Sequence, residues 1–229
     1  MKFVRTPKWL TFDCYGTLID TKKGYTEVWR DILAGKGITA ESEVVRFVGL
    51  WGTEEFRLVQ GPYKKYRDIL KESVERTLTS NGLKVSEGDG QKLADKWGTF
   101  KPYPDVKPVL TDLKKNVKLA IISNGDNDIL KQSVAGIEVE FDEVFTAEQC
   151  QAYKPSRIPF EFALGKMNVD PRDVLHVAFG YQYDHSTASE MGFMTLWVNR
   201  RELTLPEGAR KFDMEIAALA ELPGLINFK

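Results

Sequence analysis

The residue with the clearest chemical meaning in this sequence is Asp13, which ends the run Trp9–Asp13 and is followed by a turn at Gly16-Thr17. An apolar run that ends in a carboxylate predicts a buried strand whose carboxyl end presents the acid to a cleft, because open α/β sheets bind ligands at those strand ends. The plain alternative is an Asp that begins a turn, which is common. Other segments must therefore decide whether Asp13 takes part in chemistry.

Two further segments carry polar groups that suit an anionic substrate. Ser123 and Asn124 follow the apolar run Leu119–Ile122, and a hydroxyl, an amide and the backbone N–H groups after them can bind a carboxylate. Lys154 stands before a proline and can offset the negative charge that gathers around Asp13 and an anionic substrate. The alternatives are an ordinary Asn-Gly turn and a surface lysine.

The fourth segment is the β-rich run Val174–Phe179, which leads to Asp184 in a polar loop. This pattern again predicts an acid beyond the carboxyl end of a strand, with a helix N-cap as the alternative. The chain has only two histidines. We expect His176, inside the run, to be a hydrogen-bonded core residue, and His185 to be a partly exposed residue at a helix start.

Five β-rich runs alternate with helical stretches, and this alternation predicts βαβ units and a parallel sheet. The runs are Trp9–Phe12, Val117–Ser123, Glu143–Thr146, Val174–Phe179 and Thr195–Val198. After about Leu203 we expect a turn and a short closing helix. The fold class indicated is α/β, with a doubly wound, Rossmann-like parallel sheet as the core.

The interval from about Thr21 to Lys101 contains no convincing strand and predicts a helical insertion. Apolar residues recur at helical spacing in four stretches, Tyr25–Leu33, Glu43–Val59, Tyr66–Leu78 and Gln91–Trp97, with glycine-containing joints between them. We therefore expect residues 1–20 and 101–229 to form the core and residues 21–100 to form a cap. Because the insertion leaves the core directly after Asp13, it can close over the strand ends as a lid. A purely structural subdomain is the alternative.

Composition and charge narrow the class of protein. The 229 residues are 42% hydrophobic and 28% charged, and the net charge of −1 gives no basic footprint for nucleic acid. No run approaches the roughly 20 apolar residues of a membrane span, and the N-terminus lacks a signal-peptide pattern. The two cysteines, Cys14 and Cys150, fit a reducing compartment, and we interpret Cys14 as a buried filler. We therefore expect a cytoplasmic protein that binds neither membranes nor nucleic acid.

Taken in order, the four segments resemble the four motifs of the haloacid dehalogenase superfamily, which has an α/β core with a helical cap. The resemblance implies that Asp13 is a nucleophile and that Lys154 and Asp184 complete the catalytic set. The Ser-Asn-Gly form at Ser123 is similar to that of the 2-haloacid dehalogenases. In those enzymes this Ser holds the substrate carboxylate, and the following Asn, here Asn124, helps to hold the departing halide.

The same resemblance implies an arginine from the second cap helix that takes the halide. Arg46 lies at about the expected place, and Arg57 is a rival. The alternative for both residues is that they lie on a solvated helix face and contact no substrate. We also place Tyr15 and Thr17, which follow Asp13 closely, among the residues that contact the substrate.

Two departures from the phosphatase members of the superfamily indicate the type of reaction. Phosphatases carry an acid two residues after the nucleophile and a pair of metal-binding acids in the fourth motif, whereas this chain has Tyr15 and Gly180 at the matching positions. Phosphate ester cleavage needs a proton donor, and a tyrosine with a pKa near 10 is a poor one. A halide leaves without a proton. We therefore expect displacement at carbon without a metal or other cofactor.

Three residues depart from the pattern of the dehalogenases themselves. A Tyr of the family is replaced by Phe160, and a Ser and an Asn of the fourth motif are replaced by Phe179 and Tyr181. We expect Phe179 and Tyr181 to line the pocket and to narrow or shift the range of substrates, because they add bulk and remove short hydrogen-bonding groups.

Three functions remain open at this stage. The first is a hydrolase that displaces halide from a small 2-haloacid through an aspartyl ester on Asp13, or a close relative that opens another activated 2-carbon, such as that of a strained-ring amino acid. The second is a Mg²⁺-dependent phosphatase acting on a small phosphate ester, and the third is a catalytically altered binding protein with the same fold. The expected partner is a small anionic molecule, and a homodimer is a possible assembly.

Overall fold

The computed structural model describes residues 2–205, 207–209 and 212–228, and its core is a six-stranded sheet. The strands are β1 (Trp9–Phe12), β2 (Lys118–Ser123), β3 (Glu143–Thr146), β4 (Val174–Ala178), β5 (Met194–Val198) and β6 (Met214–Ile216). Their order is β3-β2-β1-β4-β5-β6, and every neighbouring pair is parallel. The predicted doubly wound α/β fold is confirmed. In this order the winding reverses between β1 and β4, which places a crevice at their carboxyl ends.

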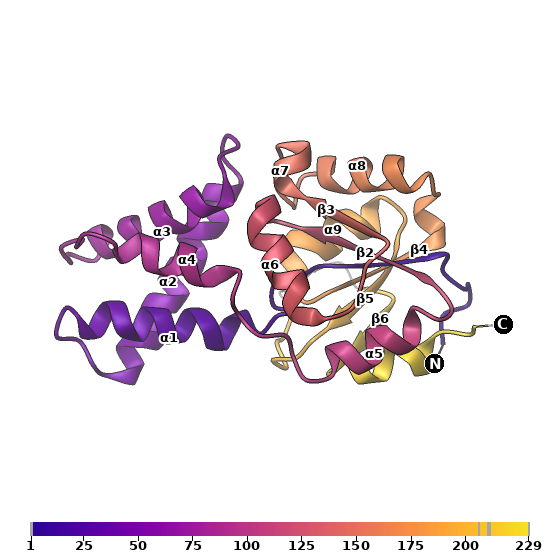
Figure 1. The fold of residues 1–229 in the computed structure, drawn as a ribbon, viewed down its shortest axis with the longest axis horizontal. Coiled ribbons are helices and arrows are strands. Elements are labelled where there is room, and N and C mark those ends of the chain that lie inside the picture. Colours follow the sequence, from indigo (N-terminus) through magenta and orange to yellow (C-terminus); the bar gives the residue numbers. More distant parts are fainter. Residues whose placement is uncertain (1, 206, 210–211, 229) are drawn as a thin grey trace.

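Helices cover both faces of the sheet (Figure 1). On one face lie α5 (Val106–Leu113), α6 (Asn127–Ile137) and η3 (Leu219–Leu225), and on the other lie α8 (Ile158–Met167) and α9 (Ser186–Glu190). Strand residues alternate between these two layers, so that Ile121 packs with α5 and α6 whereas Ile122 packs with α8. The short elements α7 (Ala147–Cys150), η1 (Pro171–Asp173) and η2 (Tyr181–His185) complete the connections.

Four helices separate β1 from the rest of the core: α1 (Thr21–Ala34), α2 (Glu41–Val59), α3 (Tyr66–Ser80) and α4 (Asp89–Trp97). They form a body beside the sheet, beyond the carboxyl end of β1 (Figure 1). This helical insertion has an apolar cluster of its own, in which Trp29, Phe47 and Leu70 are buried almost completely. The insertion therefore stands over the same edge of the sheet at which the winding reverses.

The core caps one helix of the insertion with a carboxylate. Asp126, directly before α6, is fully buried, and its oxygens accept hydrogen bonds from the backbone N–H groups of Tyr66 (2.7 Å) and Arg67 (3.0 Å). These are among the first N–H groups of α3, which have no partner inside the helix. The side chain of Arg67 also pairs with Asp126, at 3.3 Å. The insertion is thus fixed to the core at the start of α3 as well as at its two chain crossings.

The C-terminal segment differs from the expectation. It contains β6, a three-residue edge strand that the sequence analysis missed, ahead of the closing 3₁₀ helix η3. A strand this short offers too little alternation to be recognised. Within the described residues, none of the helices combines the length and the apolar character that a membrane span requires.

Candidate active site

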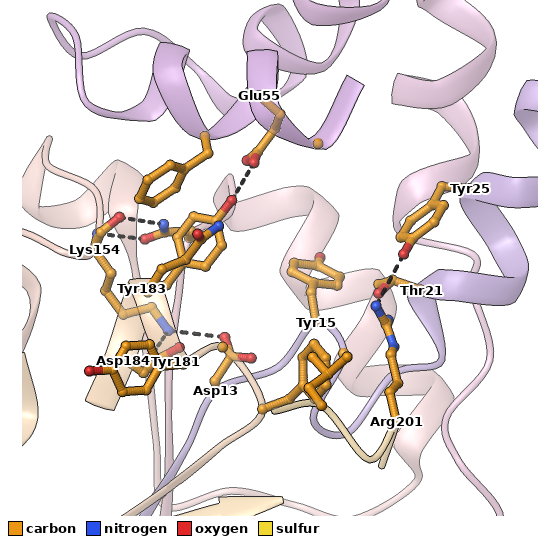
Figure 2. A pocket seen from close by; sticks show the side chains of 18 of the residues that line it. Asp13, Tyr15, Thr21, Tyr25, Glu55, Lys154, Tyr181, Tyr183, Asp184 and Arg201 are labelled. Carbon is orange, nitrogen blue, oxygen red and sulfur yellow. Dashed lines mark hydrogen bonds and ion pairs between the residues drawn. The ribbon is translucent and has the colours of Figure 1, made fainter. Parts of the chain in front are cut away.

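A cavity of about 600 Å³ lies between the carboxyl ends of β1 and β4 and the helical insertion (Figure 2). The core contributes the charged side chains of this cavity: Asp13, Lys154, Asp184 and Arg201. The insertion contributes mainly aromatic side chains and a single carboxyl group: Tyr25, Trp51, Phe56, Tyr66, Trp97 and Glu55. The predicted catalytic residues and the helical insertion thus face one common cavity.

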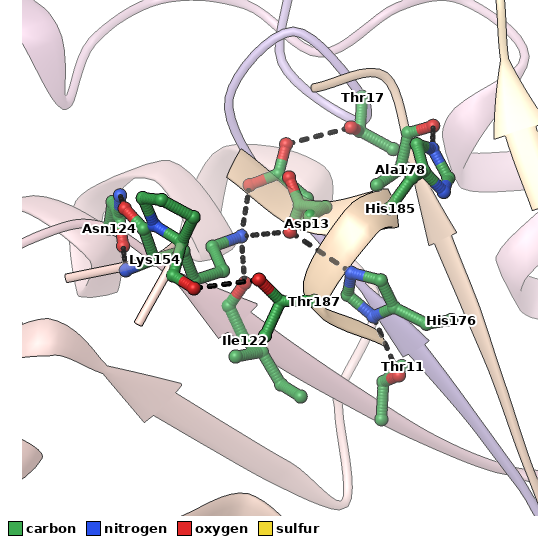
Figure 3. Close-up of polar contacts among 12 residues, drawn as sticks. Thr11, Asp13, Thr17, Ile122, Asn124, Lys154, His176, Ala178, His185 and Thr187 are labelled. Atoms are coloured by element: carbon green, nitrogen blue, oxygen red, sulfur yellow. Dashed lines mark hydrogen bonds and ion pairs between the residues drawn. The ribbon is translucent and has the colours of Figure 1, made fainter. Parts of the chain in front are cut away.

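Lys154 is the centre of the charged floor. Its side chain is 1% exposed, and Nζ donates to Asp13 Oδ1 (3.0 Å), Asp184 Oδ1 (2.6 Å) and the carbonyl oxygen of Ile122 (2.8 Å). An ammonium group has three donors, and these three contacts use all of them. Burial lowers the pKa of Lys154, but the two carboxylates outweigh burial and hold it above the ordinary value. Lys154 is therefore a fixed positive charge between two acids (Figure 3).

Asp184 and Asp13 differ in their electrostatic surroundings. Burial raises the pKa of each carboxyl group. At Asp184, Lys154 and His176 outweigh burial and lower the pKa to about 2. For Asp13, burial and the nearby Asp184 outweigh Lys154, and the pKa lies above its usual value. His176 Nε2 lies 3.0 Å from Asp184 Oδ1, and its Nδ1 lies 2.9 Å from Thr11 Oγ1. His176 is fully buried and hydrogen-bonded, as predicted.

Thr17 holds Asp13 from the side opposite Lys154. Its hydroxyl donates to Asp13 Oδ2 at 2.8 Å and accepts the backbone N–H of Phe179 at 2.8 Å. Thr17 is completely buried and is not part of the cavity wall. In this geometry the Thr17 side chain lies behind Asp13 and orients its carboxylate, and its predicted contact with the substrate stays a prediction.

The Ser-Asn pair after β2 has two different environments. Ser123 Oγ is buried and has no hydrogen-bond partner among the described residues, and Ser123 is not part of the cavity wall. The side chain of Asn124 lines the cavity, but its Nδ2 donates to the carbonyl oxygen of Lys154 and its Oδ1 accepts the Lys154 backbone N–H, at 2.9 and 2.7 Å. Asn124 thereby fixes the segment that carries Lys154, and both ends of its amide are occupied.

The three aromatic residues expected near the nucleophile line the cavity. These are Tyr15, Phe179 and Tyr181. The Tyr15 hydroxyl lies 3.1 Å from Ser133 Oγ, and burial raises the pKa of Tyr15 well above its ordinary value. Tyr15 is therefore unsuited to donate a proton to a leaving group. Phe160, in contrast, is fully buried against His176 and Phe193, away from the cavity.

Neither predicted halide-binding arginine lies in the cavity wall. Arg46 is hydrogen-bonded to Glu43 (2.9 Å) and Asn81 (3.1 Å), and Arg57 is paired with Glu54 (2.5 Å), all within the insertion. Both arginine side chains are about half exposed, at 47% and 56%. The structure thus places Arg46 on the solvated face of α2, where it corresponds to the alternative of a solvated helix face, and its contact with the halide stays an untested prediction.

The expectation for His185 is wrong. His185 is 2% exposed, its Nε2 lies 2.9 Å from the carbonyl oxygen of Ala178, and its ring lies 5.3 Å from that of Phe212. Burial lowers its pKa to about 4, so the ring is neutral near pH 7. Cys14 is buried and free, in agreement with its predicted role as a filler.

The sequence analysis missed the polar group that the insertion places in the roof of the cavity. Glu55 of α2 is 6% exposed, and its two oxygens accept hydrogen bonds from the hydroxyls of Tyr66 (3.1 Å) and Tyr183 (2.6 Å). Burial raises the pKa of Glu55 to about 6, although both hydroxyls oppose that rise. A signal was present, because Glu55 shares the buried stripe of α2 with Trp51 and Leu58.

The donor set does not fit a catalytic magnesium ion. A Cβ on Gly180 would lie 2.9 Å from Asp184 Oδ2, so the carboxylate of Asp184 occupies the space that a second acid would need. Asp13 and Asp184 already share the ammonium group of Lys154, whereas Mg²⁺ requires free oxygen ligands. In the part of the chain that is described, no three His, Cys, Asp or Glu side chains are grouped as a metal site.

Asp13 is placed for nucleophilic attack. Its oxygens are held by Lys154 and Thr17 at the floor of a cavity, and an oriented carboxylate can form an ester with an electrophilic carbon. No acid stands two residues later to protonate a leaving group, since Tyr15 occupies that position. The geometry therefore suits a leaving group that departs as a stable anion.

Comparisons with known proteins agree with this chemistry. Residues 7–178 match the family model of haloacid dehalogenase-like hydrolases. Over 225 residues the chain is 28% identical to an (S)-2-haloacid dehalogenase of Pseudomonas fluorescens, covering 94% of this chain and 95% of that protein. It is 25% identical to haloacetate dehalogenase H-2 of Moraxella sp. (strain B), with 95% and 96% covered.

The fold of a solved dehalogenase is also similar. The structure of the L-2-haloacid dehalogenase from Xanthobacter autotrophicus with chloropropionic acid covalently bound matches with a TM-score of 0.76 and 22% identity. The match covers 96% of this chain and 98% of that one. At this identity the likeness shows a shared fold.

Proposed function

We propose that this chain, which belongs to the haloacid dehalogenase-like hydrolase family, hydrolyses the carbon–halogen bond of a small 2-haloacid through an ester on Asp13. The observation that carries the proposal is the Asp13 carboxylate, held by Lys154 and Thr17 at the floor of the cavity. The curated relatives with dehalogenase names support it, as does the family member with chloropropionic acid covalently bound.

In the first step an oxygen of Asp13 attacks C2 of the substrate. The new bond is an ester bond between Asp13 and C2, the carbon–halogen bond breaks, and the halide leaves with its electron pair. Ser123 Oγ, which lacks a partner among the described residues, is the group that we assign to the substrate carboxylate; Ser123 is not part of the cavity wall, so its side chain has to turn to reach the substrate. Lys154 offsets the charge of Asp13 and Asp184, so that an anionic substrate can approach.

In the second step water attacks the carboxyl carbon of the Asp13 ester. The bond between that carbon and the oxygen attached to C2 breaks, and this oxygen takes one proton of the water, so that the 2-hydroxy acid leaves. The second proton of the water passes by way of the acceptor to solvent, and the Asp13 carboxylate is restored. Asp184, kept ionised by Lys154 and His176, is the acceptor that we assign to the attacking water. Lys154 stabilises the negative charge that develops on the ester oxygen.

A single turnover in ¹⁸O-labelled water, with enzyme in excess over 2-chloropropionate, tests the proposal. If Asp13 is the nucleophile, the label enters the Asp13 carboxyl group and the first hydroxy acid product carries none. Label in that first product would mean direct attack by water and would overturn the covalent mechanism. The nearly isosteric variant Asp13→Asn should retain the fold and form no ester.

Halide release, measured with and without divalent metal, tests the reaction class. Halide release should be unchanged after exhaustive chelation, because the site lacks the second acid at Gly180 and the proton donor at Tyr15. A parallel assay with a phosphate monoester and Mg²⁺ should show no turnover. Activity that is lost on chelation and restored by Mg²⁺ would favour the phosphatase class instead.

A further inference from the structure

The departing halide needs a positive charge or strong donors in the cavity, and the residues expected to supply them are elsewhere or already occupied. We propose that Arg201, in the loop after β5, receives the halide in this protein. The inference rests on the proposed function, because it concerns the leaving group of that reaction. It moves the halide contact from the insertion to the core.

The insertion has no arginine to offer. Each of its five arginines has a carboxylate partner within 4.0 Å, and none of the five lines the cavity. The pairs are Arg30–Glu41, Arg46–Glu43, Arg57–Glu54, Arg67–Asp126 and Arg76–Glu72. The charge that the insertion places in the cavity belongs to Glu55, whose ionised form would repel a halide.

The other candidates in the floor are fully engaged. All three donors of Lys154 are used by Asp13, Asp184 and the carbonyl oxygen of Ile122. The amide of Asn124 is tied at both ends to the backbone of Lys154. Neither group can hold a halide without giving up an existing hydrogen bond.

Arg201 is a positively charged residue of the cavity wall, and it still has an N–H group without a hydrogen-bond partner among the described residues. Its guanidinium carbon lies 4.4 Å from the centre of the Phe179 ring, and Nη1 lies 3.3 Å from the Tyr25 hydroxyl. Nε is buried without a hydrogen-bond partner, and Arg201 forms no ion pair among residues 2–205, 207–209 and 212–228. A buried guanidinium N–H without a partner is costly, so a small turn of the side chain toward an anion in the cavity would be favourable.

The direction of displacement agrees with this position. Attack by Asp13 expels the halide on the side of C2 that faces away from Asp13, which is the side of the insertion. The guanidinium of Arg201 reaches that side, because it contacts Tyr25 of α1 (Figure 2). Stacking on Phe179 holds the planar group in place, so Phe179 supports the halide contact rather than blocking the reaction.

The halogen dependence of the variant Arg201→Gln provides the test. Ester formation in a single turnover should fall about a hundredfold with 2-chloropropionate and about tenfold or less with 2-iodopropionate, because iodide leaves with less assistance from a charge-assisted hydrogen bond. Arg201→Lys keeps the charge and should recover part of the rate with chloride.

A binding measurement provides a readout without turnover. Trp51, Trp97 and Trp197 line the cavity, so iodide bound at Arg201 should quench tryptophan fluorescence with saturation at constant ionic strength. Arg201→Gln should lose this saturable component. Arg46→Gln and Arg57→Gln are matched controls on the outer face of α2, and both should bind iodide and turn over substrate like the wild type.

Two results would overturn the inference. The first is an equal loss of rate for the chloro, bromo and iodo acids with iodide binding intact, which would assign Arg201 to the substrate carboxylate. The second is an Arg201→Gln variant that matches the wild type in both measurements. Failure of the proposed function looks different, since the wild type itself would then release no halide and place no label on Asp13.

Discussion

Two buried carboxyl groups face the same cavity from opposite sides, and their pKa values are shifted in opposite directions. Asp184, on the core side, is 1% exposed and has a pKa lowered to about 2, whereas Glu55, on the insertion side, is 6% exposed and has a pKa raised to about 6. Burial raises both values. The difference lies in the neighbours, because Lys154 and His176 face Asp184 while two tyrosine hydroxyls face Glu55.

The comparison separates the tasks of the two regions. The core supplies fixed charges at the ends of its strands, where the backbone leaves little freedom, and in the proposed mechanism these charges bind and attack the substrate. The insertion supplies aromatic surface and one carboxyl group without a cationic partner. A roof of this kind excludes water and shapes the cavity, so it affects which substrate enters more than how the bond is broken.

The largest effect is expected on the core side, from Lys154→Met. This change leaves Asp13 and Asp184 buried without their shared cation, so halide release should fall about a thousandfold and the free energy of unfolding by about 3–5 kcal/mol. Steady-state kinetics and urea unfolding measure the two effects. Lys36→Met is the matched control, because Lys36 is a half-buried lysine of the insertion paired with Asp89 at 2.7 Å. The Lys36→Met variant should lose stability but keep its kcat. If its kcat falls as much as that of Lys154→Met, loss of stability explains the effect of both variants.

On the insertion side, Glu55→Gln should change how stability depends on pH. The pKa of Glu55 is about 6 in the folded state and 4.5 for a glutamate without these surroundings, as in the unfolded chain. The folded chain of the wild type therefore loses stability as pH rises through this window. The stability of the variant relative to wild type should therefore increase by about 2 kcal/mol between pH 4 and pH 7. Urea unfolding at several pH values measures it.

Glu54→Gln is the control for that comparison. Glu54 is the neighbour of Glu55 on the outer face of α2, and its hydrogen bond with Arg57 lowers its pKa. Its ionisation therefore stabilises the folded state, and the variant should lose stability relative to wild type as pH rises. The same sign for both variants would contradict the assignment of the raised pKa to Glu55.

A smaller effect is expected where the two regions meet, from Tyr181→Asn. The change removes a ring from the cavity wall and restores a short hydrogen-bonding group, so kcat/KM for small 2-haloacids should rise about fivefold relative to bulkier ones. Rates for a series of 2-halo acids of increasing chain length measure this selectivity. An unchanged ratio together with a lower Tm would identify Tyr181 as a packing residue.

The smallest effect is expected from Arg46→Ala. Its ion pair with Glu43 is exposed, so stability should change by less than about 0.5 kcal/mol and turnover by less than twofold. Thermal unfolding and steady-state rates check this. A loss of turnover above tenfold would return Arg46 to the reaction and remove the division between the two regions.

The sequence was sufficient for the parts of the site that lie at strand ends. Asp13 and Asp184 follow apolar runs, and a parallel sheet brings the ends of such runs to one edge, so local pattern carried the information. Thr17 lies four residues after Asp13, yet only the structure shows that it faces away from the cavity. Spacing places a residue near a site but does not give the direction of its side chain.

Contacts across the cavity are harder to predict from the sequence. The pair Glu55–Tyr183 joins residues 128 apart, and no local pattern in the sequence links the two positions. Arg46 and Arg57 were credible from their place in α2, but each is satisfied by a glutamate three residues earlier. An arginine that already has a carboxylate one turn away is a poor candidate for a ligand, and that local test can be applied to other sequences.

The carboxylate of Asp126 has a mechanical consequence for the protein. A body joined to its support only by two neighbouring chain crossings can swing about the line between them, whereas a third attachment away from that line stops the swing. Asp126 supplies such an attachment, since rotation would strip the backbone N–H groups of Tyr66 and Arg67 of their acceptor. Under the proposed function we therefore expect substrate exchange to proceed through smaller displacements of cavity-lining segments such as Leu203–Leu205, with the insertion still docked on the core.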